Sequence, residues 1–294
     1  MPFALRILII YPLLAILGLA AVAIAIVAII IALAYPNLPS LDVLTDYHPK
    51  IPMRIYTADG FLMGEFGEER RAVVAIDAVP TVMKQAILAA EDDRFYQHIG
   101  IDYMGILRAA SANLLRGSKT QGASTITQQV ARNFFLTTEK TYTRKLYEAL
   151  LSLKIESSLS KDQILELYIN QIFLGQRAYG FAAAAQIYFG KPLAQISIAE
   201  AAMLAGLPKA PSAYNPIANP RRARIRQEYV LRRMRELNYI NSAQYEAALK
   251  EPLIIKRELS EYAVHAEYAA EMARQIAADS FPEFAYTAGI KVYT

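Results

Sequence analysis

The stretch EDDRFYQHIG, residues 91–100, holds three acids, an arginine, a histidine and two aromatic residues within ten positions. It follows an apolar run with helical spacing, so Glu91 is expected at the C-terminal end of a helix. The negative end of the helix dipole favours a protonated carboxyl group there, which suits an acid or base that works near neutral pH. The composition alone is at least as typical of an exposed, solvated charge cluster.

A second polar group lies in QGASTITQQVARNFFL, residues 121–136. Ser124 is expected to cap a helix here, and the free backbone N–H groups of a helix start attract anions. Capping explains one residue, whereas the start carries five hydroxyl or amide side chains: Ser124, Thr125, Thr127, Gln128 and Gln129. The apolar run 134–136 is interpreted either as core or as a contact with a membrane interface.

Four cations, Arg132, Lys140, Arg144 and Lys145, follow the polar group. Glu148 shares a helix face with Arg144, four residues before it, and with Lys145, three before it. Two interpretations remain open. The set is either a surface ladder of ion pairs, worth a few tenths of a kcal/mol each, or a slot for a phosphate or pyrophosphate in which Glu148 orients the cations.

Helices and a hairpin are expected to position these groups. Residues 52–78 alternate apolar and polar in RIYTADGFLMGEF and AVVAI around Asp59-Gly60, which predicts a β-hairpin. The pattern is then helical to about residue 279, and AYTAGIKVYT at the end favours a strand whose partner strands are missing.

Several sequence signals mark the helix starts. Pro80, Asp102 and Asn219-Pro220 precede helical patterns, and S-x-x-Q and S-x-x-E capping boxes begin at Ser160 and Ser197. The helix after Asp102 is expected to bury one face, formed by Ile106, Leu107, Ala110 and Leu114.

The N-terminus predicts a membrane anchor. No charged residue occurs from Ile7 to Leu41, and residues 7–35 exceed the roughly 20 helical residues that a bilayer core requires. The run is too long for a cleaved signal peptide. Arg6 precedes the span, and the acids that follow it contribute little to orientation, so the N-terminus is expected inside.

Composition narrows the function further. The 294-residue chain has no cysteine, which excludes disulfides and cysteine-ligated zinc, and its net charge of +4 does not by itself imply nucleic acid. His48, His98 and His265 are too dispersed for a histidine metal site. Residues 158–161 match S-x-x-K of transpeptidases, but no K-[ST]-G exists, so Ser160 is interpreted as a helix cap.

Taken in order, these blocks resemble the glycosyltransferase domain of class A penicillin-binding proteins, glycosyltransferase family 51. The blocks are ED-x-x-F-x-x-H-x-G, G-x-S-T-x-x-Q-Q, R-K-x-x-E, S-K-x-x-I-L-E-x-Y-x-N and the later AAMLAGLPKAPSAYNP and RRARIRQEYVLRRM. Each is weak alone, but in this order they are specific, and they cover roughly residues 85–240.

The resemblance implies a mainly α, lysozyme-like glycosyltransferase domain with a small β-hairpin, preceded by one transmembrane helix and ending in a strand of a truncated β linker domain. The implied organisation is a cytoplasmic tail at 1–6, an anchor at 7–35, a linker at 36–52, the glycosyltransferase domain at 53–245 and a linker toward a missing transpeptidase domain at 246–294.

The resemblance also implies roles for residues. Glu91 resembles the base that deprotonates the acceptor 4-hydroxyl of lipid II, and Glu148 the second glutamate near the leaving undecaprenyl pyrophosphate, in an inverting reaction that forms β-1,4-linked glycan. The other matching positions are pyrophosphate-binding Arg132, Lys140, Arg144 and Lys145; cleft-lining Ser124, Thr125, Gln128 and Gln129; Asn170 of the fourth block; and supporting Asp92, Phe95 and His98.

The expected partners are lipid II, the growing lipid-linked glycan strand, the bilayer and other cell-wall synthesis proteins, with no nucleic acid. The expected location is the bacterial inner membrane, single-pass, with the N-terminus cytoplasmic and the catalytic domain periplasmic. No cofactor is required and no metal ligand is assigned; Mg or Mn on the pyrophosphate, held by acids such as Glu91 or Asp92, is left open. The alternatives are a lysozyme-like muramidase and a non-catalytic membrane-anchored scaffold.

Overall fold

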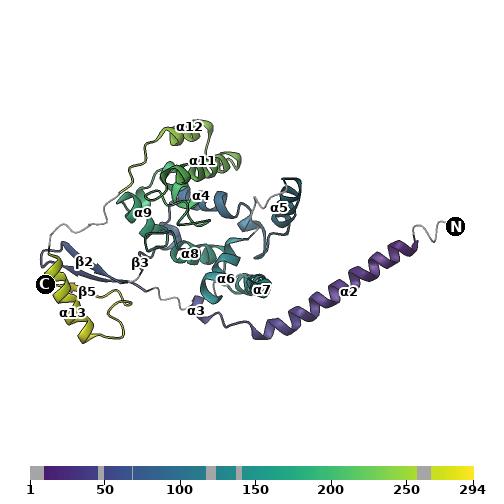
Figure 1. Cartoon of the computed structure of the whole chain (residues 1–294), viewed down its shortest axis with the longest axis horizontal. Helices are drawn as coiled ribbons and strands as arrows, with labels where there is room; N and C mark the ends of the chain where they lie inside the picture. Colours follow the sequence, from purple (N-terminus) through teal and green to yellow (C-terminus); the bar gives the residue numbers. More distant parts are fainter. Residues whose placement is uncertain (1–9, 46–49, 68, 117–123, 137–140, 257–265) are drawn as a thin grey trace.

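A computed structural model describes residues 10–45, 50–67, 69–116, 124–136, 141–256 and 266–294. The predicted mainly α class is confirmed, because helices make up most of the described chain (Figure 1). The α-helices are α2 (Tyr11–Ala34), α3 (Asp42–Thr45), α4 (Thr81–Glu91), α5 (Tyr103–Arg116), α6 (Ile126–Phe135), α7 (Tyr142–Ser158), α8 (Lys161–Gln171), α9 (Phe181–Phe189), α10 (Ile198–Gly206), α11 (Pro220–Glu236), α12 (Ser242–Lys250) and α13 (Glu267–Ser280). Short 3₁₀ turns cover Tyr35–Asn37, Ile76–Ala78, Phe95–Gln97 and Leu193–Gln195.

The predicted hairpin is confirmed. Strands β1 (Met53–Tyr56) and β2 (Leu62–Phe66) pair antiparallel around the expected turn. The C-terminal strand β5 (Lys291–Tyr293) runs parallel to β1, with Arg54 opposite Lys291. The expectation that this strand lacks a partner in the chain is therefore wrong, since the hairpin more than 200 residues earlier supplies one.

The strand expected in AVVAI, residues 72–76, does not form. Strand β3 stops at Arg70–Arg71, where it pairs with β4 (Ala178–Tyr179), and the chain enters a 3₁₀ turn at Ile76. The backbone N–H of Val74 donates to the side chain of Asn170, and that of Ile76 donates to Glu166. Side chains of α8 thus take the hydrogen bonds that a neighbouring strand would have provided.

Two apolar cores organise the described residues. The smaller lies between the three-stranded sheet and α13, and is built on Met53, Ile55 and the alanines of α13. The larger joins two groups of helices: α4, α10 and α11 pack together, and α6 packs on α7 and α8. Glu91 on α4 and Gln129 on α6 contact each other where these two groups meet.

Helix α10 is the centre of one group. Its predicted capping box is confirmed: Ser197 accepts from the N–H of Glu200, whose side chain accepts from the N–H of Ser197. Residues Ala199 to Gly206 are all buried, and small side chains let α4 and α11 approach closely. A Cβ on Gly206 would stand 2.8 Å from Cγ of Arg226, so this glycine makes room for that arginine.

Helix α5 differs from the expectation. Ile106 and Leu107 are 41% and 65% exposed, and the buried face consists of the small residues Gly105 and Ala109. The predicted inner face of this helix is therefore wrong at these two positions and at exposed Ala110, because none of the described elements covers it.

Helix α2 is long and apolar enough to cross a membrane, by length and composition. It extends away from the rest of the protein (Figure 1), and of its described side chains only that of Ala34, at its C-terminal end, is buried. Part of the expected linker packs on the helical domain, since Leu38 and Leu44 are buried in the large core.

Candidate active site

A cleft of about 900 Å³ lies between the two helix groups. The end of α4, one face of α5, the start of α6, the loop after α10 and one face of α11 line it. Its ionisable lining residues are Glu91, Asp92, Asp93, Asp102, Arg108, Arg132, Lys209, Tyr214, Arg226, Tyr229, Arg232, Arg233 and Glu236.

Glu91 is the last residue of α4, as predicted, and its side chain is only 12% exposed. Nε2 of Gln129 donates to one carboxylate oxygen at 2.9 Å, and a guanidinium nitrogen of Arg226 lies 3.6 Å from the other. Burial raises the pKa of Glu91 above its usual value, and the Gln129 hydrogen bond and the charges of Arg226, Lys209 and Arg132 partly offset that rise. The main cause is desolvation, not the helix dipole invoked from the sequence.

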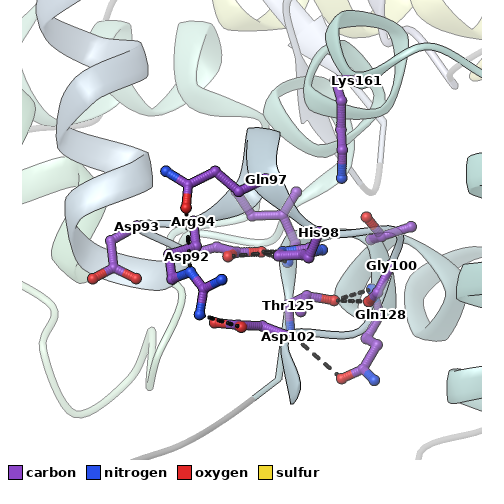
Figure 2. A network of polar contacts seen from close by, with 12 residues as sticks. Asp92, Asp93, Arg94, Gln97, His98, Gly100, Asp102, Thr125, Gln128 and Lys161 are labelled. Carbon is purple, nitrogen blue, oxygen red and sulfur yellow. Dashed lines mark hydrogen bonds and ion pairs between the residues drawn. The ribbon is translucent and has the colours of Figure 1, made fainter. Parts of the chain in front are cut away.

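Asp92 connects the end of α4 to the start of α6 (Figure 2). Its buried carboxylate accepts the backbone N–H of Ile126 at 3.0 Å and contacts Nε2 of His98 at 3.1 Å. The Phe95 ring is buried edge-on to His98. Asp92 and Phe95 thus both contact His98, next to Glu91 in the chain, and the supporting role that the resemblance implies for the three stays a prediction. The N-terminal amide of α6 already has an anion in the protein's own Asp92.

The start of α6 differs from the prediction by one residue. Thr125, not Ser124, is the N-cap, and it forms a capping box with Gln128. The Thr125 hydroxyl donates to the carbonyl of Gly100 at 2.6 Å. Gly100 has φ +88°, and a Cβ there would stand 2.8 Å from the Ser152 carbonyl oxygen, so the loop after Glu91 lies directly against α7. Ser124 is left with its hydroxyl available to Lys145, which donates to it at 2.9 Å.

Helix α7 carries the predicted cationic face. Glu148 is buried, and its two carboxylate oxygens accept from Arg144 at 2.5 Å and Lys145 at 2.7 Å. Lys145 also donates to Gln128 at 3.3 Å. We call Arg144, Lys145 and Glu148 the α7 cluster; it adjoins the cleft through Ser124, which lines it.

Two further predicted cations have different surroundings. Arg132 lines the cleft, and its side chain makes no ion pair or hydrogen bond with the residues that the structure describes. Lys140 lies outside the described residues. Asn170 does not line the cleft: its amide group bonds both backbone polar groups of Val74, so the structure gives it a role in holding residues 72–76 on α8.

Sequence reasoning missed several residues that the structure brings to the cleft. Arg226 is 8% exposed in its side chain, lies 4.5 Å from the Tyr229 ring and is the cation nearest Glu91 among the described residues. Lys209 faces the same space. Asp93 connects α5 to α11 by contacting Arg108 at 3.3 Å and Arg233 at 2.7 Å. The arginine-rich block around Arg226 was noted in the sequence, but nothing in it singled out this residue.

The sequence left open a divalent ion held by acids such as Glu91 or Asp92. Within the described ranges, no group of three or more His, Asp or Glu side chains is arranged to hold a metal ion. Both Asp92 oxygens already have protein partners.

Ser160 is the N-cap of α8 in a capping box with Gln163, as predicted. The run 134–136 is partly buried against the large core, in agreement with the core interpretation.

Comparisons with known proteins identify the family of the chain. A family model described as Transglycosylase matches residues 59–235, more than half of the chain. "Penicillin-binding protein 1A" of Neisseria lactamica is 56% identical over 277 residues, which are 94% of this chain and 35% of that protein. The protein of the same name from Pseudomonas aeruginosa is 47% identical over 259 residues, which are 88% and 32% of the two chains.

A solved structure of a protein with the same name is also similar to this chain. The crystal structure of Penicillin-Binding Protein 1A from Haemophilus influenzae is 35% identical, with a TM-score of 0.50 over 84% of this chain and 27% of that one. The chain spans about a third of the length of the curated relatives it matches. Its sequence blocks, its helical fold and the family match lead to one conclusion: the chain belongs to the transglycosylase family.

Proposed function

We propose that the protein is a peptidoglycan glycosyltransferase that polymerises lipid II into β-1,4-linked glycan strands. The observation that carries this proposal is Glu91, a buried carboxylate with a raised pKa in a cleft that arginines and a lysine line together with acids. One amide, that of Gln129, holds it. A general base works best when its pKa lies near the working pH, and burial moves Glu91 in that direction.

The proposed step is a balanced displacement. The 4-hydroxyl oxygen of the acceptor sugar attacks the anomeric carbon of the growing glycan, and the bond from that carbon to the pyrophosphate oxygen breaks. Glu91 accepts the hydroxyl proton, and undecaprenyl pyrophosphate leaves with the electron pair. Attack opposite the leaving group inverts the configuration.

The α7 cluster, with Arg132, is proposed to stabilise the departing pyrophosphate. Glu148 uses both oxygens to hold Arg144 and Lys145, so it acts as a positioning residue and not as a second base. Cations that are already oriented stabilise developing negative charge without reorganising during the reaction. Ser124, Gln128 and Lys140 are proposed to take part in the same region.

The proposed location is the bacterial inner membrane, with α2 as a single-pass anchor, the N-terminus in the cytoplasm and the catalytic domain in the periplasm. The observations behind it are the apolar length of α2 and its exposure. Lipid II and the lipid-linked strand would then meet the cleft from the bilayer.

The test is polymerisation of labelled lipid II by the wild-type chain and by Glu91→Gln, with preformed sacculi as a separate substrate. We expect polymer from the wild type alone and no fragments from sacculi. Fragments from sacculi without polymer would favour the muramidase. A Glu91→Gln variant that polymerises at the wild-type rate would mean that Glu91 is not the base.

A further inference from the structure

Seven residues that follow the candidate anchor are docked on the helical domain. We call Leu38–Leu44 the exit segment. Leu38 and Leu44 are 7% and 4% exposed and belong to the large core, and Leu41 is partly buried against it. Three leucines at spacings of three residues thus fix the chain immediately after α2 to the domain that holds the cleft.

The exit segment is attached to the helix that bears the α7 cluster. Nζ of Lys154 on α7 donates to the carbonyl of Pro39 at 2.9 Å. Lys154 lies six residues after Glu148, which is about 9 Å along a helix axis. Figure 1 agrees, since α3, at the end of the exit segment, lies near α6 and α7.

The joint between α2 and the exit segment is short. A 3₁₀ turn at Tyr35–Asn37 follows α2 directly, and the N–H of Leu38 donates to the carbonyl of Tyr35 at 3.2 Å. The side chain of Asn37 donates to the carbonyl of Leu33 at 2.9 Å, which satisfies an end carbonyl of α2. Pro36 within this turn and Pro39 just after it restrict φ at the joint.

We propose that the exit segment is a positioning element, which fixes the height and orientation of the cleft above the bilayer in which α2 lies. This inference rests on the proposed function and membrane location. Lipid-linked substrates present their pyrophosphate at the bilayer surface. A cleft held at one fixed height above the bilayer is therefore already aligned with that pyrophosphate. A flexible tether would instead let the domain sample many heights and orientations, which lowers the effective concentration of the correctly aligned pair.

Two insertions of equal length distinguish a positioning role of the exit segment from a simple effect of the distance between α2 and the catalytic domain. Six Gly-Ser residues inserted after Asn37 lie between α2 and the buried leucines, whereas the same six after Thr45 lie beyond them. A flexible insert of six residues spans about 13 Å on average. Both variants keep the cleft residues, and each is assayed for lipid II polymerisation in lipid vesicles and in detergent.

The insertion after Asn37 should lower the rate in vesicles about fivefold and leave the rate in detergent within twofold of wild type. The insertion after Thr45 should leave both rates within twofold. Equal losses from both insertions would show that length alone matters, and no loss from the Asn37 insertion would show that height is unimportant; either result overturns the proposal.

A second readout does not depend on activity. Because the chain has no cysteine, a single fluorophore can be attached at exposed Ser157 on α7 as Ser157→Cys. Energy transfer to acceptors on the vesicle surface then reports the height of α7. The Asn37 insertion should change and broaden this distance, and the Thr45 insertion should not. Identical distances in both variants, or a changed distance with an unchanged vesicle rate, would contradict the proposal. An inactive wild type would instead refute the proposed function and leave the height measurement valid.

Discussion

Two glutamates near the cleft are buried in different ways. Glu91 accepts one amide hydrogen bond and has its nearest guanidinium at 3.6 Å, whereas Glu148 receives ion pairs at 2.5 and 2.7 Å. A carboxylate with few partners retains affinity for a proton, and one that already holds two cations has both oxygens occupied. Under the proposed mechanism this difference in partners separates the two roles: Glu91 is left able to act as the base, and Glu148 positions the cations.

Replacing Glu91 should have the largest effect on rate. Glu91→Gln keeps the side-chain shape and removes the base, so kcat for lipid II polymerisation should fall at least about 10³-fold. The melting temperature should stay equal or rise, because a desolvated carboxylate is removed. Glu228→Gln, an exposed acid on α11, is the matched control and should leave the rate unchanged.

The same variant gives a stability test with a defined sign. The pKa of Glu91 is raised in the folded protein, so the folded protein binds this proton more tightly than the unfolded chain does. This contribution to the free energy of unfolding is complete below the ordinary glutamate pKa and is lost as the pH rises through the folded pKa. The stability advantage of Glu91→Gln over wild type should therefore grow with pH across that window. Chemical denaturation at a series of pH values measures it, and an advantage that shrinks with pH would contradict a raised pKa.

Glu148→Gln should affect stability most. It leaves Arg144 and Lys145 beside each other without their acid, and breaking a buried pair in this way costs about 3 kcal/mol. The melting temperature should fall by roughly 6–10 °C, with a loss of rate that follows from misplaced cations. If Glu148→Gln instead matched Glu91→Gln, with a lost rate and unchanged stability, the two glutamates would have the same role.

Arg226→Gln should change the pH dependence more than the maximal rate. Removing the nearest positive charge raises the pKa of Glu91 further, so the acid limb of kcat/KM should move to higher pH. Arg224→Gln, on the same helix but outside the cleft lining, serves as the control. An acid limb that stays in place would show that Arg226 does not act on the base.

Lys145→Gln should have the smallest effect on stability. Half of this side chain is exposed, so its ion pair with Glu148 is worth at most about 1 kcal/mol. Because the ammonium faces Ser124 at the cleft edge, KM should rise several-fold while the melting temperature changes little. A large loss of stability without a change in KM would assign Lys145 to structure alone.

The sequence predicted features that depend on local spacing. The capping boxes at Ser160 and Ser197, the end of α4 at Glu91 and the shared face of Arg144, Lys145 and Glu148 all follow from residues three or four positions apart. The order of the sequence blocks along the chain indicated a family by resemblance, and the comparisons confirmed that family.

Features that depend on distant partners could not be predicted. Seven arginines occur in α11, and only the space left by Gly206 on α10 shows why Arg226 lies beside Glu91. Thr125 and not Ser124 caps α6 by accepting the N–H of Gln128, and its hydroxyl also donates a hydrogen bond to the Gly100 carbonyl, a partner that only the fold supplies. The apolar face of α5 failed as a core prediction because periodicity identifies a face but not what covers it.

The most direct test of the contrast between the glutamates is the pH dependence of kcat/KM for lipid II polymerisation by wild type and Glu148→Gln. We predict that the acid limb of kcat/KM lies at a pH above the ordinary range of a glutamate in both proteins. In Glu148→Gln the value of kcat/KM should be lower, but its acid limb should lie at the same pH as in the wild type. A limb within the ordinary range in the wild type, or one that moves or disappears in Glu148→Gln, would contradict the assignment of Glu91 as the base and Glu148 as the residue that positions the cations.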